Sequence, residues 1–250
     1  MIYTIKPNPG KQIEIDVDGT SYCRYPIKTE VFKNGDHYAT KIAANVRKHI
    51  SDILGNSKKN WYVIVSEKIV AISQGRSYFI KDIRPSWFAT TLSKYVRKTP
   101  HGIGLGSPWT MQLAIQEVGL PRILLASVVS IATKPFGLRG IFYHIAGRRA
   151  AAIDGPTSYS LYPSNVSAKL APKDPQKAAE NIKDQISNIK IQSSTFGGVV
   201  IIDANDLGRN VLGNATDKPD SFFEEVMRDN PMGQGSEQTP VVILCESMDR

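Results

Sequence analysis

The apolar run Gly197–Ile202 ends at an acidic residue, Asp203. A short run rich in β-branched residues predicts a buried strand, and side chains at the C-terminal end of such a strand commonly face the crevice where ligands bind. A second acid, Asp154, follows the apolar stretch Ala151–Ile153 and could face the first. Together with glycine-rich turns and a basic chain, the two acids indicate a divalent cation that holds phosphates.

Strand and hairpin signals dominate the first part of the chain. Polar and apolar residues alternate over Gln12–Val17, which predicts a half-buried strand. Asp18–Gly19 then predicts a hairpin turn, with Tyr22–Ile27 as the returning strand. A helix is expected from Asp36, as its cap, to Gly55, where it ends.

The middle of the chain is less regular. Trp61–Ile72 predicts a buried strand that runs into a glycine turn, and Ser86–Val96 predicts a helix. Trp109–Val118 predicts another helix, because Ser107–Pro108 supplies a cap and a first-turn proline. Periodicity does not separate strand from helix for Ile123–Ala132.

The last third contains the clearest helix, which opens at Asp174–Pro175, and two strands at Gly198–Ile202 and Val241–Cys245. Strands and helices mix without a regular βαβ rhythm. The pattern predicts an α+β fold with a mixed β-sheet and flanking helices. We expect a single domain over residues 1–250, with a helical sub-region at residues 85–150.

The chain is basic, with a net charge of +8 and a pI near 9.4. The excess favours anionic partners such as nucleotides, polycarboxylates or nucleic acid, although it also fits a solvated surface. Nucleic acid is the weaker option, because no run of five basic residues occurs. Two distant cysteines, no signal-peptide pattern and no apolar run of spanning length predict a cytoplasmic protein without a membrane partner.

Three segments are candidates for chemistry. Magnesium and manganese bind through one or two carboxylates plus substrate phosphates, which suits Asp154 and Asp203, although either acid also fits an N-cap or an Asx-turn. In Ser66–Arg76, a strand that leads into a glycine turn could place cations at phosphates, or could be a solvated turn. The loop Asn230–Glu237 could reach a metal or nucleotide, or could be plain surface.

In this order, the segments resemble the coenzyme F(420)-0:L-glutamate ligase (gamma-glutamyl ligase) family. The matching motifs are Lys68–Val70 with Gln74–Arg76, Ala152–Asp154, Ile202–Asn205 with Gly208–Arg209, and Met232–Gly235. Their shared order is more persuasive than any single motif. The chain is identified as a divergent member, since Gln74 and Gln234 stand where the family has glutamates.

The resemblance implies an amide ligase that joins glutamate to a carboxylate acceptor, driven by GTP or ATP with Mn²⁺ or Mg²⁺, and a homodimer of gamma-glutamyl-ligase-like fold. It implies Asp154, Asp203 and Gln234 as metal ligands. It places the nucleotide at a second group of residues: Lys68, Gln74, Gly75, Arg76, Asn205 and Arg209. Asp206, inserted before Gly208, could restore a lost charge.

Phosphoryl transfer to the acceptor carboxylate would form an acyl phosphate that the amino group of glutamate attacks. Asp154, Asp203 and Arg209 would act in catalysis. The partners would be a nucleoside triphosphate, glutamate and an anionic small-molecule acceptor such as a deazaflavin phosphodiester or a folate. A relative that binds a nucleotide or metabolite without catalysis is the alternative, and a basic nucleic-acid-binding domain is a third.

Overall fold

The computed structural model describes residues 5–55, 59–96, 104–138, 140–156, 162–189, 194–205, 208–233 and 235–247. The chain divides into two compact units, one formed by residues 1–74 and 172–250 and the other by residues 75–171. The first unit holds two hydrophobic clusters and the second unit holds a third.

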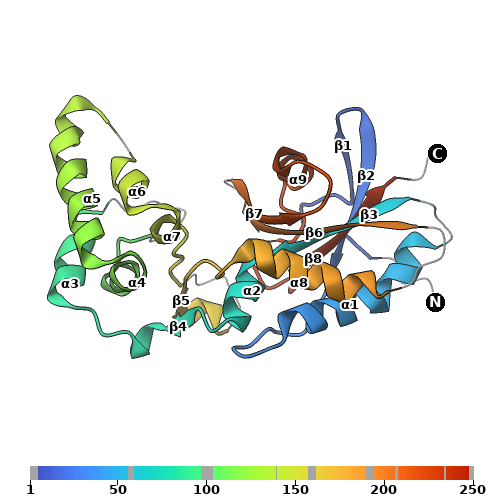
Figure 1. The fold of residues 1–250 in the computed structure, drawn as a ribbon, viewed down its shortest axis with the longest axis horizontal. Coiled ribbons are helices and arrows are strands. Elements are labelled where there is room, and N and C mark those ends of the chain that lie inside the picture. Colours follow the sequence, from blue (N-terminus) through green and yellow to red (C-terminus); the bar gives the residue numbers. More distant parts are fainter. Residues whose placement is uncertain are drawn as a thin grey trace. The chain divides into compact units, whose positions relative to one another are not determined.

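A six-stranded mixed sheet forms the centre of the first unit, in the strand order β1-β2-β8-β3-β6-β7 (Figure 1). Strands β3 (Asn60–Ser66) and β6 (Thr195–Ala204) are parallel, whereas the other neighbouring pairs are antiparallel. The remaining strands are β1 (Glu14–Val17), β2 (Thr20–Ile27), β7 (Arg209–Ala215) and β8 (Val241–Glu246). This sheet with its flanking helices confirms the predicted α+β class.

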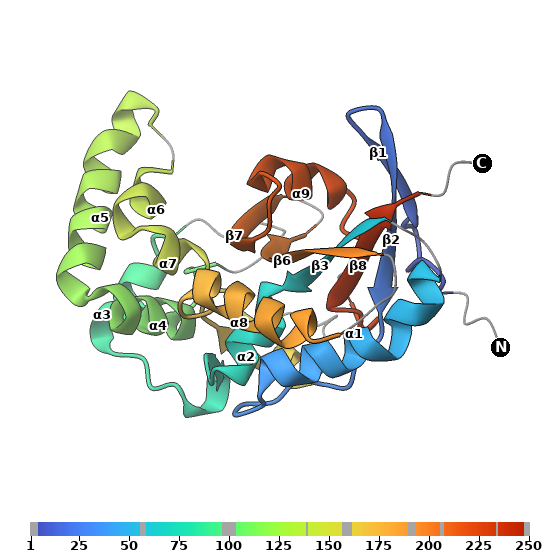
Figure 2. The same ribbon diagram turned by 45° about the vertical axis from the view of Figure 1, so that its right-hand side comes forward.

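Helices cover both faces of the sheet. Helices α1 (Tyr38–Leu54) and α8 (Pro175–Ser187) lie together on one face, and α9 (Asp220–Val226) lies on the other (Figures 1 and 2). Because successive strand residues point to opposite faces, Val63 joins the core under α1 and α8, and Ile64 joins the core under α9. Every residue from Trp61 to Val65 is therefore buried.

The predicted hairpin is confirmed. Val17 lies opposite Thr20, so Asp18 and Gly19 form a two-residue loop between β1 and β2. Their φ angles of 50° and 78° are the positive values that this turn requires at both positions. Asp-Gly meets that requirement at little steric cost, which explains why this dipeptide predicted the turn correctly.

Two predicted boundaries were wrong. The strand expected over Trp61–Ile72 ends at Ser66, and the rest is the short helix α2 (Glu67–Ser73). Nearly all of this segment is buried, so its apolar run has no period that separates strand from helix. Asp36 does not cap α1: its Oδ2 accepts hydrogen bonds from the Lys33 backbone and the Lys41 ammonium, and His37 occupies the N-cap position.

The second unit combines a two-stranded sheet with short helices. Strands β4 (Ser77–Phe79) and β5 (Ser167–Lys169) pair antiparallel. The helices are α3 (Trp87–Ser93), α4 (Pro108–Val118), α5 (Leu120–Thr133), α6 (Ile141–Ala146), α7 (Arg148–Ala151) and the short 3₁₀ turns η1 (Ile80–Asp82), η2 (Lys134–Phe136) and η3 (Ser164–Val166). The segment Ile123–Ala132 is thus helical, and the predicted cap of α4 is confirmed, because Ser107 Oγ accepts from the Thr110 N–H.

Among the described residues, none of the helices is by itself long and apolar enough to cross a membrane. A pair bent by 116°, Pro108–Val118 and Leu120–Phe136, reaches that length and composition only when taken together.

Candidate functional site

Parallel strands β3 and β6 end at the same edge of the sheet, and most candidate residues of the first unit lie there. Ser66, the last residue of β3, is the register partner of Ile202 in β6. Asp203 and the first turn of α2 therefore follow at this edge, the position where open sheets bind ligands. The Ser66 N–H also donates to the carbonyl of Pro240, 2.8 Å away, so the loop before β8 arrives at the same edge.

The hairpin between β6 and β7 carries Asp203 and Asn205. Asp203 is half-buried and lies opposite Asn210 of β7. Asn205 Oδ1 accepts from the Gly208 N–H at 2.9 Å, and the Asn205 N–H donates to the Gly208 carbonyl at 3.0 Å. Asn205 therefore makes the local side-chain contact that closes this turn. Asp206 lies outside the described residues.

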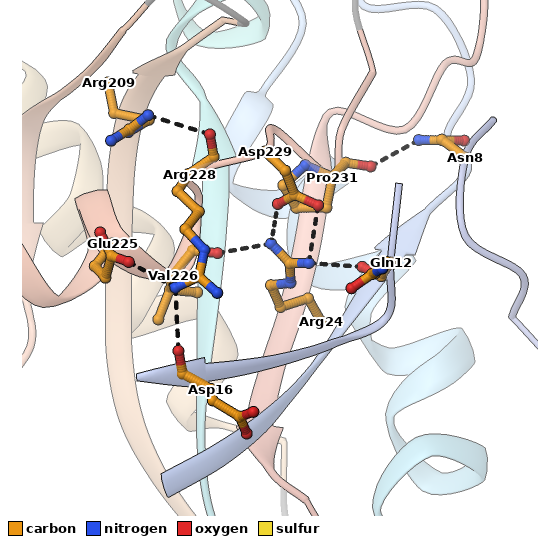
Figure 3. A network of polar contacts seen from close by, with 10 residues as sticks. All are labelled: Asn8, Gln12, Asp16, Arg24, Arg209, Glu225, Val226, Arg228, Asp229 and Pro231. Atoms are coloured by element: carbon orange, nitrogen blue, oxygen red, sulfur yellow. Dashed lines mark hydrogen bonds and ion pairs between the residues drawn. The ribbon is translucent and has the colours of Figure 1, made fainter. Parts of the chain in front are cut away.

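Arg209 begins β7 beside this hairpin and is exposed. Its Nη1 donates to the carbonyl of Arg228, 3.1 Å away (Figure 3). Arg228 in turn donates to the Asp16 carbonyl at 3.1 Å and to Glu225 Oε1 at 2.6 Å. The Arg209 side chain is therefore directed toward the segment that follows α9, with its positive charge accessible to solvent.

A buried arginine fixes that segment. Arg24 of β2 is 1% exposed, and it donates to the Val226 carbonyl at 2.8 Å, to the Gln12 carbonyl at 2.7 Å and to both carboxylate oxygens of Asp229 (Figure 3). Burial alone would raise the pKa of Asp229, but the hydrogen bonds and charge of Arg24 outweigh it, so the pKa lies below its ordinary value. The start of the loop that carries Met232 is thus tied to the sheet.

The loop itself is held by polar contacts on both sides of Gln234. Thr239 Oγ1 donates to the Met232 carbonyl at 2.8 Å, and the Gly235 N–H donates to Glu237 Oε2 at 2.7 Å. Gln234 itself lies outside the described residues, so its role as a metal ligand stays a prediction.

Lys68 lies in the first turn of α2 rather than in a turn after a strand, and its side chain is half-buried. Its position next to the end of β3 places this cation at the same edge as Asp203.

Gln74 ends α2, and its side-chain amide pairs with the backbone of Lys173. Oε1 accepts from the Lys173 N–H at 2.6 Å, and Nε2 donates to the Lys173 carbonyl at 2.9 Å. A carboxylate could accept the first bond but not donate the second. The glutamine at this position therefore joins α2 to the segment that leads into α8.

Replacing Gln74 with glutamate should lower the free energy of unfolding by about 1 kcal/mol, because one hydrogen bond is lost and a charge faces the Lys173 carbonyl. Urea denaturation measures the change. Gln185→Glu, at an exposed position of α8, adds the same charge without this pairing and serves as the control. Equal stability of the two variants would contradict the pairing role.

In the second unit, Gly75 has a φ of 72° and precedes Arg76. The Arg76 guanidinium donates to the Ala171 carbonyl and to Glu117 Oε1 at 2.8 Å, and the Arg76 and Glu117 side chains are only 17% and 14% exposed. The interpretation of Arg76 as a solvated cation is therefore wrong. A phosphate at Arg76 would have to share its charge with Glu117.

Asp154 also belongs to the second unit. Its backbone exchanges hydrogen bonds of 2.9 and 2.8 Å with Lys169, and its Oδ2 lies 3.2 Å from Lys169 Nζ. The Asp154 side chain is 59% exposed, whereas that of Lys169 is 7% exposed. Asp154 is thus an accessible carboxylate with a buried cation beside it. Since Asp203 is in the first unit, the pairing of the two acids stays a prediction.

Within the described part of the chain, no group of three or more His, Cys, Asp or Glu side chains forms a ready metal cluster. Magnesium and manganese do not need one, because they bind through one or two carboxylates and complete their shell with water and substrate phosphates. At the β3–β6 edge, Asp203 and the neighbouring Glu67 supply oxygens of that chemistry. The residue types at this edge therefore suit such a cation.

Among the residues that the structure describes, the sequence analysis missed the buried charges of Arg24, Glu67 and Lys169. Glu67 lies in the first turn of α2 and is 5% exposed. It directly follows Ser66, the residue of β3 that pairs with Ile202 of β6. An acid inside an otherwise apolar segment was the available signal for Glu67. Arg24 and Lys169 gave no comparable signal, because each depends on partners distant in sequence.

In a comparison with protein families, the family described as F420-0:gamma-glutamyl ligase matches residues 26–209. The chain belongs to the F420-0:gamma-glutamyl ligase family. The match confirms the resemblance found in the sequence and supports gamma-glutamyl ligase activity in general. It includes Lys68, Asp154 and Asp203, ends at Arg209, and leaves the Met232 loop outside. No curated protein matches the chain.

Proposed function

We propose that this gamma-glutamyl ligase family member is a nucleotide- and divalent-metal-dependent amide ligase that adds glutamate to a carboxylate acceptor. The family match carries the proposal. The β3–β6 edge supports it, because strands that end together there bring Asp203, Lys68 and Arg209 to one part of the first unit.

A carboxylate does not react with an amine at neutral pH until one of its oxygens becomes a leaving group. Transfer of the γ-phosphoryl group of GTP or ATP to the acceptor carboxylate forms an acyl phosphate, and attack by the glutamate amino group releases phosphate and leaves the amide. Lys68 and Arg209 would stabilise the negative charge that shifts during the transfer. Exposure of Arg209 allows it to meet an incoming nucleotide.

Asp203, with Glu67 beside it, would hold Mn²⁺ or Mg²⁺ at this edge. The cation, when bound, neutralises phosphate oxygens as charge moves between them. Asp203 is half-buried, so its carboxylate keeps access to solvent while strand pairing with β7 fixes its backbone.

A non-catalytic binding protein of the same fold is the second candidate. Two residues that were predicted to bind the nucleotide have partners within the protein, which favours this candidate. Gln74 pairs with the Lys173 backbone, and Arg76 pairs with Glu117. Both arrangements engage groups that phosphoryl transfer would otherwise use.

Incubation of the purified chain with GTP or ATP, Mn²⁺, glutamate and a carboxylate acceptor tests the proposal. Phosphate should be released only when glutamate and a suitable acceptor are both present, with F420-0 as the first acceptor to try and folates as the second. Nucleotide binding without phosphate release would support the non-catalytic candidate. Absence of both binding and release would contradict both.

A further inference from the structure

Lys169 is a buried cation that the proposed mechanism does not use. It is the last residue of β5, and it pairs with Ser77 of β4 on one side and with Asp154 on the other. The Asp154 and Lys169 backbones exchange hydrogen bonds of 2.9 and 2.8 Å. Because residues directly opposite each other in an antiparallel pair project to the same face, this pairing brings the Lys169 ammonium to the Asp154 carboxylate, and Nζ lies 3.2 Å from Oδ2.

The surroundings of Lys169 make a negative partner necessary. Its side chain is 7% exposed, and its chain neighbours Ala168 and Leu170 are both buried in the core of the second unit. An ammonium group out of water is costly unless an opposite charge lies next to it. Asp154 supplies such a charge.

Glu117, a second acid of this unit, is engaged by arginines. Its Oε1 accepts from Arg76 at 2.8 Å and lies 4.0 Å from Arg149 Nε. Arg76 directly precedes β4, the strand that pairs with β5. These ion pairs therefore join three cations, Arg76, Arg149 and Lys169, to two acids, Asp154 and Glu117.

A divalent cation at Asp154 would have to join a group of charges that is already positive. Bound to either oxygen of this carboxylate, the cation would lie on the order of 5 Å from the Lys169 ammonium, where the two positive charges repel each other in a partly buried site. It would also compete with Lys169 for the charge that neutralises the buried ammonium. The arrangement at Asp154 therefore does not fit a divalent cation.

We propose that the Lys169 ammonium takes the place of a divalent cation at Asp154, so that Asp154 is a counter-charge for β5 and not a metal ligand in this chain. The metal role that the family resemblance implies for Asp154 is replaced by an internal ion pair. The cation of the proposed function is then held in the first unit, by Asp203 with Glu67. This location of the cation rests on the proposed function, whereas the Asp154–Lys169 pair lies entirely in the second unit and is independent of it.

Urea denaturation of the whole chain tests the proposal, first with EDTA and then with Mn²⁺ and a GTP analogue that cannot be hydrolysed. With EDTA, Asp154→Asn should lower the ratio of folded to unfolded protein about tenfold, because Lys169 keeps its buried charge and loses this carboxylate. Asp184→Asn, at an exposed position of α8, is the matched control and should change the ratio less than about twofold. Mn²⁺ should stabilise the wild-type chain and Asp154→Asn by the same factor, because the cation binds at another place.

Lys169→Met supplies a second test, since Asp154→Asn should change the ratio less than about twofold once the ammonium is absent. If Lys169→Met does not fold, the comparison of Asp154→Asn with Asp184→Asn decides by itself. Equal stability of these two variants with EDTA would overturn the proposal, as would a stabilisation by Mn²⁺ that Asp154→Asn reduces severalfold. Failure of Mn²⁺ to stabilise the wild-type chain would contradict the metal of the proposed function, and the comparison with EDTA would still decide the role of Lys169.

Discussion

Replacing Asp229 with alanine should lower the free energy of unfolding by about 3 kcal/mol, because it leaves the charge of Arg24 buried without its carboxylate partner. Removing one member of a fully buried pair costs about 3–5 kcal/mol, but here only Arg24 is fully buried, because the Asp229 side chain is 35% exposed. We expect the lower end of that range, because Arg24 keeps its hydrogen bonds to the Val226 and Gln12 carbonyls.

Glu30→Ala is the control for this variant. Glu30 pairs with Lys48 at 3.4 Å, but both side chains are about 60% exposed, so its removal should cost less than about 1 kcal/mol. Urea denaturation of both variants at neutral pH gives the two values. Similar small losses would show that the Arg24 pair does not hold the loop to the sheet.

The same pair gives a defined pH dependence. Arg24 lowers the pKa of Asp229 below its ordinary value of 3.8, so the stability that this carboxylate contributes is fully present above that value. It is lost as the pH falls through the lowered pKa. The stability difference between the wild-type chain and Asp229→Ala should therefore stay constant near neutral pH and shrink only below about pH 4.

Local signals predicted the parts of the fold whose causes are local. The Asp18–Gly19 hairpin follows from two positive φ angles, and the cap of α4 follows from the Ser107 hydroxyl. The junction between β3 and α2 was missed, because burial on all sides removes the period that separates a strand from a helix.

In the candidate site, too, the sequence predicted the local features and not the long-range contacts. The position of Asp203 at the end of a buried strand could be predicted from the apolar run before it. The Arg24–Asp229 pair could not, because the two residues are 205 positions apart and meet only through the sheet. The contact between Arg76 and Glu117, which are 41 positions apart, could not be predicted for the same reason. From the sequence, Arg76 looked free to bind a phosphate.

Replacing Asp203 with asparagine should reduce the proposed ligase turnover about a hundredfold or more, because the loss of the proposed metal-binding carboxylate removes several kcal/mol of charge stabilisation in phosphoryl transfer. The fold should remain, since the side chains have nearly the same shape. Asp184→Asn, at an exposed position of α8, makes the same change away from the sheet edge and should leave turnover unchanged. Comparable turnover in the two variants would remove Asp203 from the mechanism.

Calorimetric titration of Mn²⁺ into the chain, in the presence of a GTP analogue that cannot be hydrolysed, tests the assignment of the β3–β6 edge most directly. The wild-type chain and Asp184→Asn should bind Mn²⁺ with the same affinity, and Asp203→Asn should bind it at least about tenfold more weakly. Unchanged Mn²⁺ affinity in Asp203→Asn would contradict the placement of the cation and nucleotide at this edge.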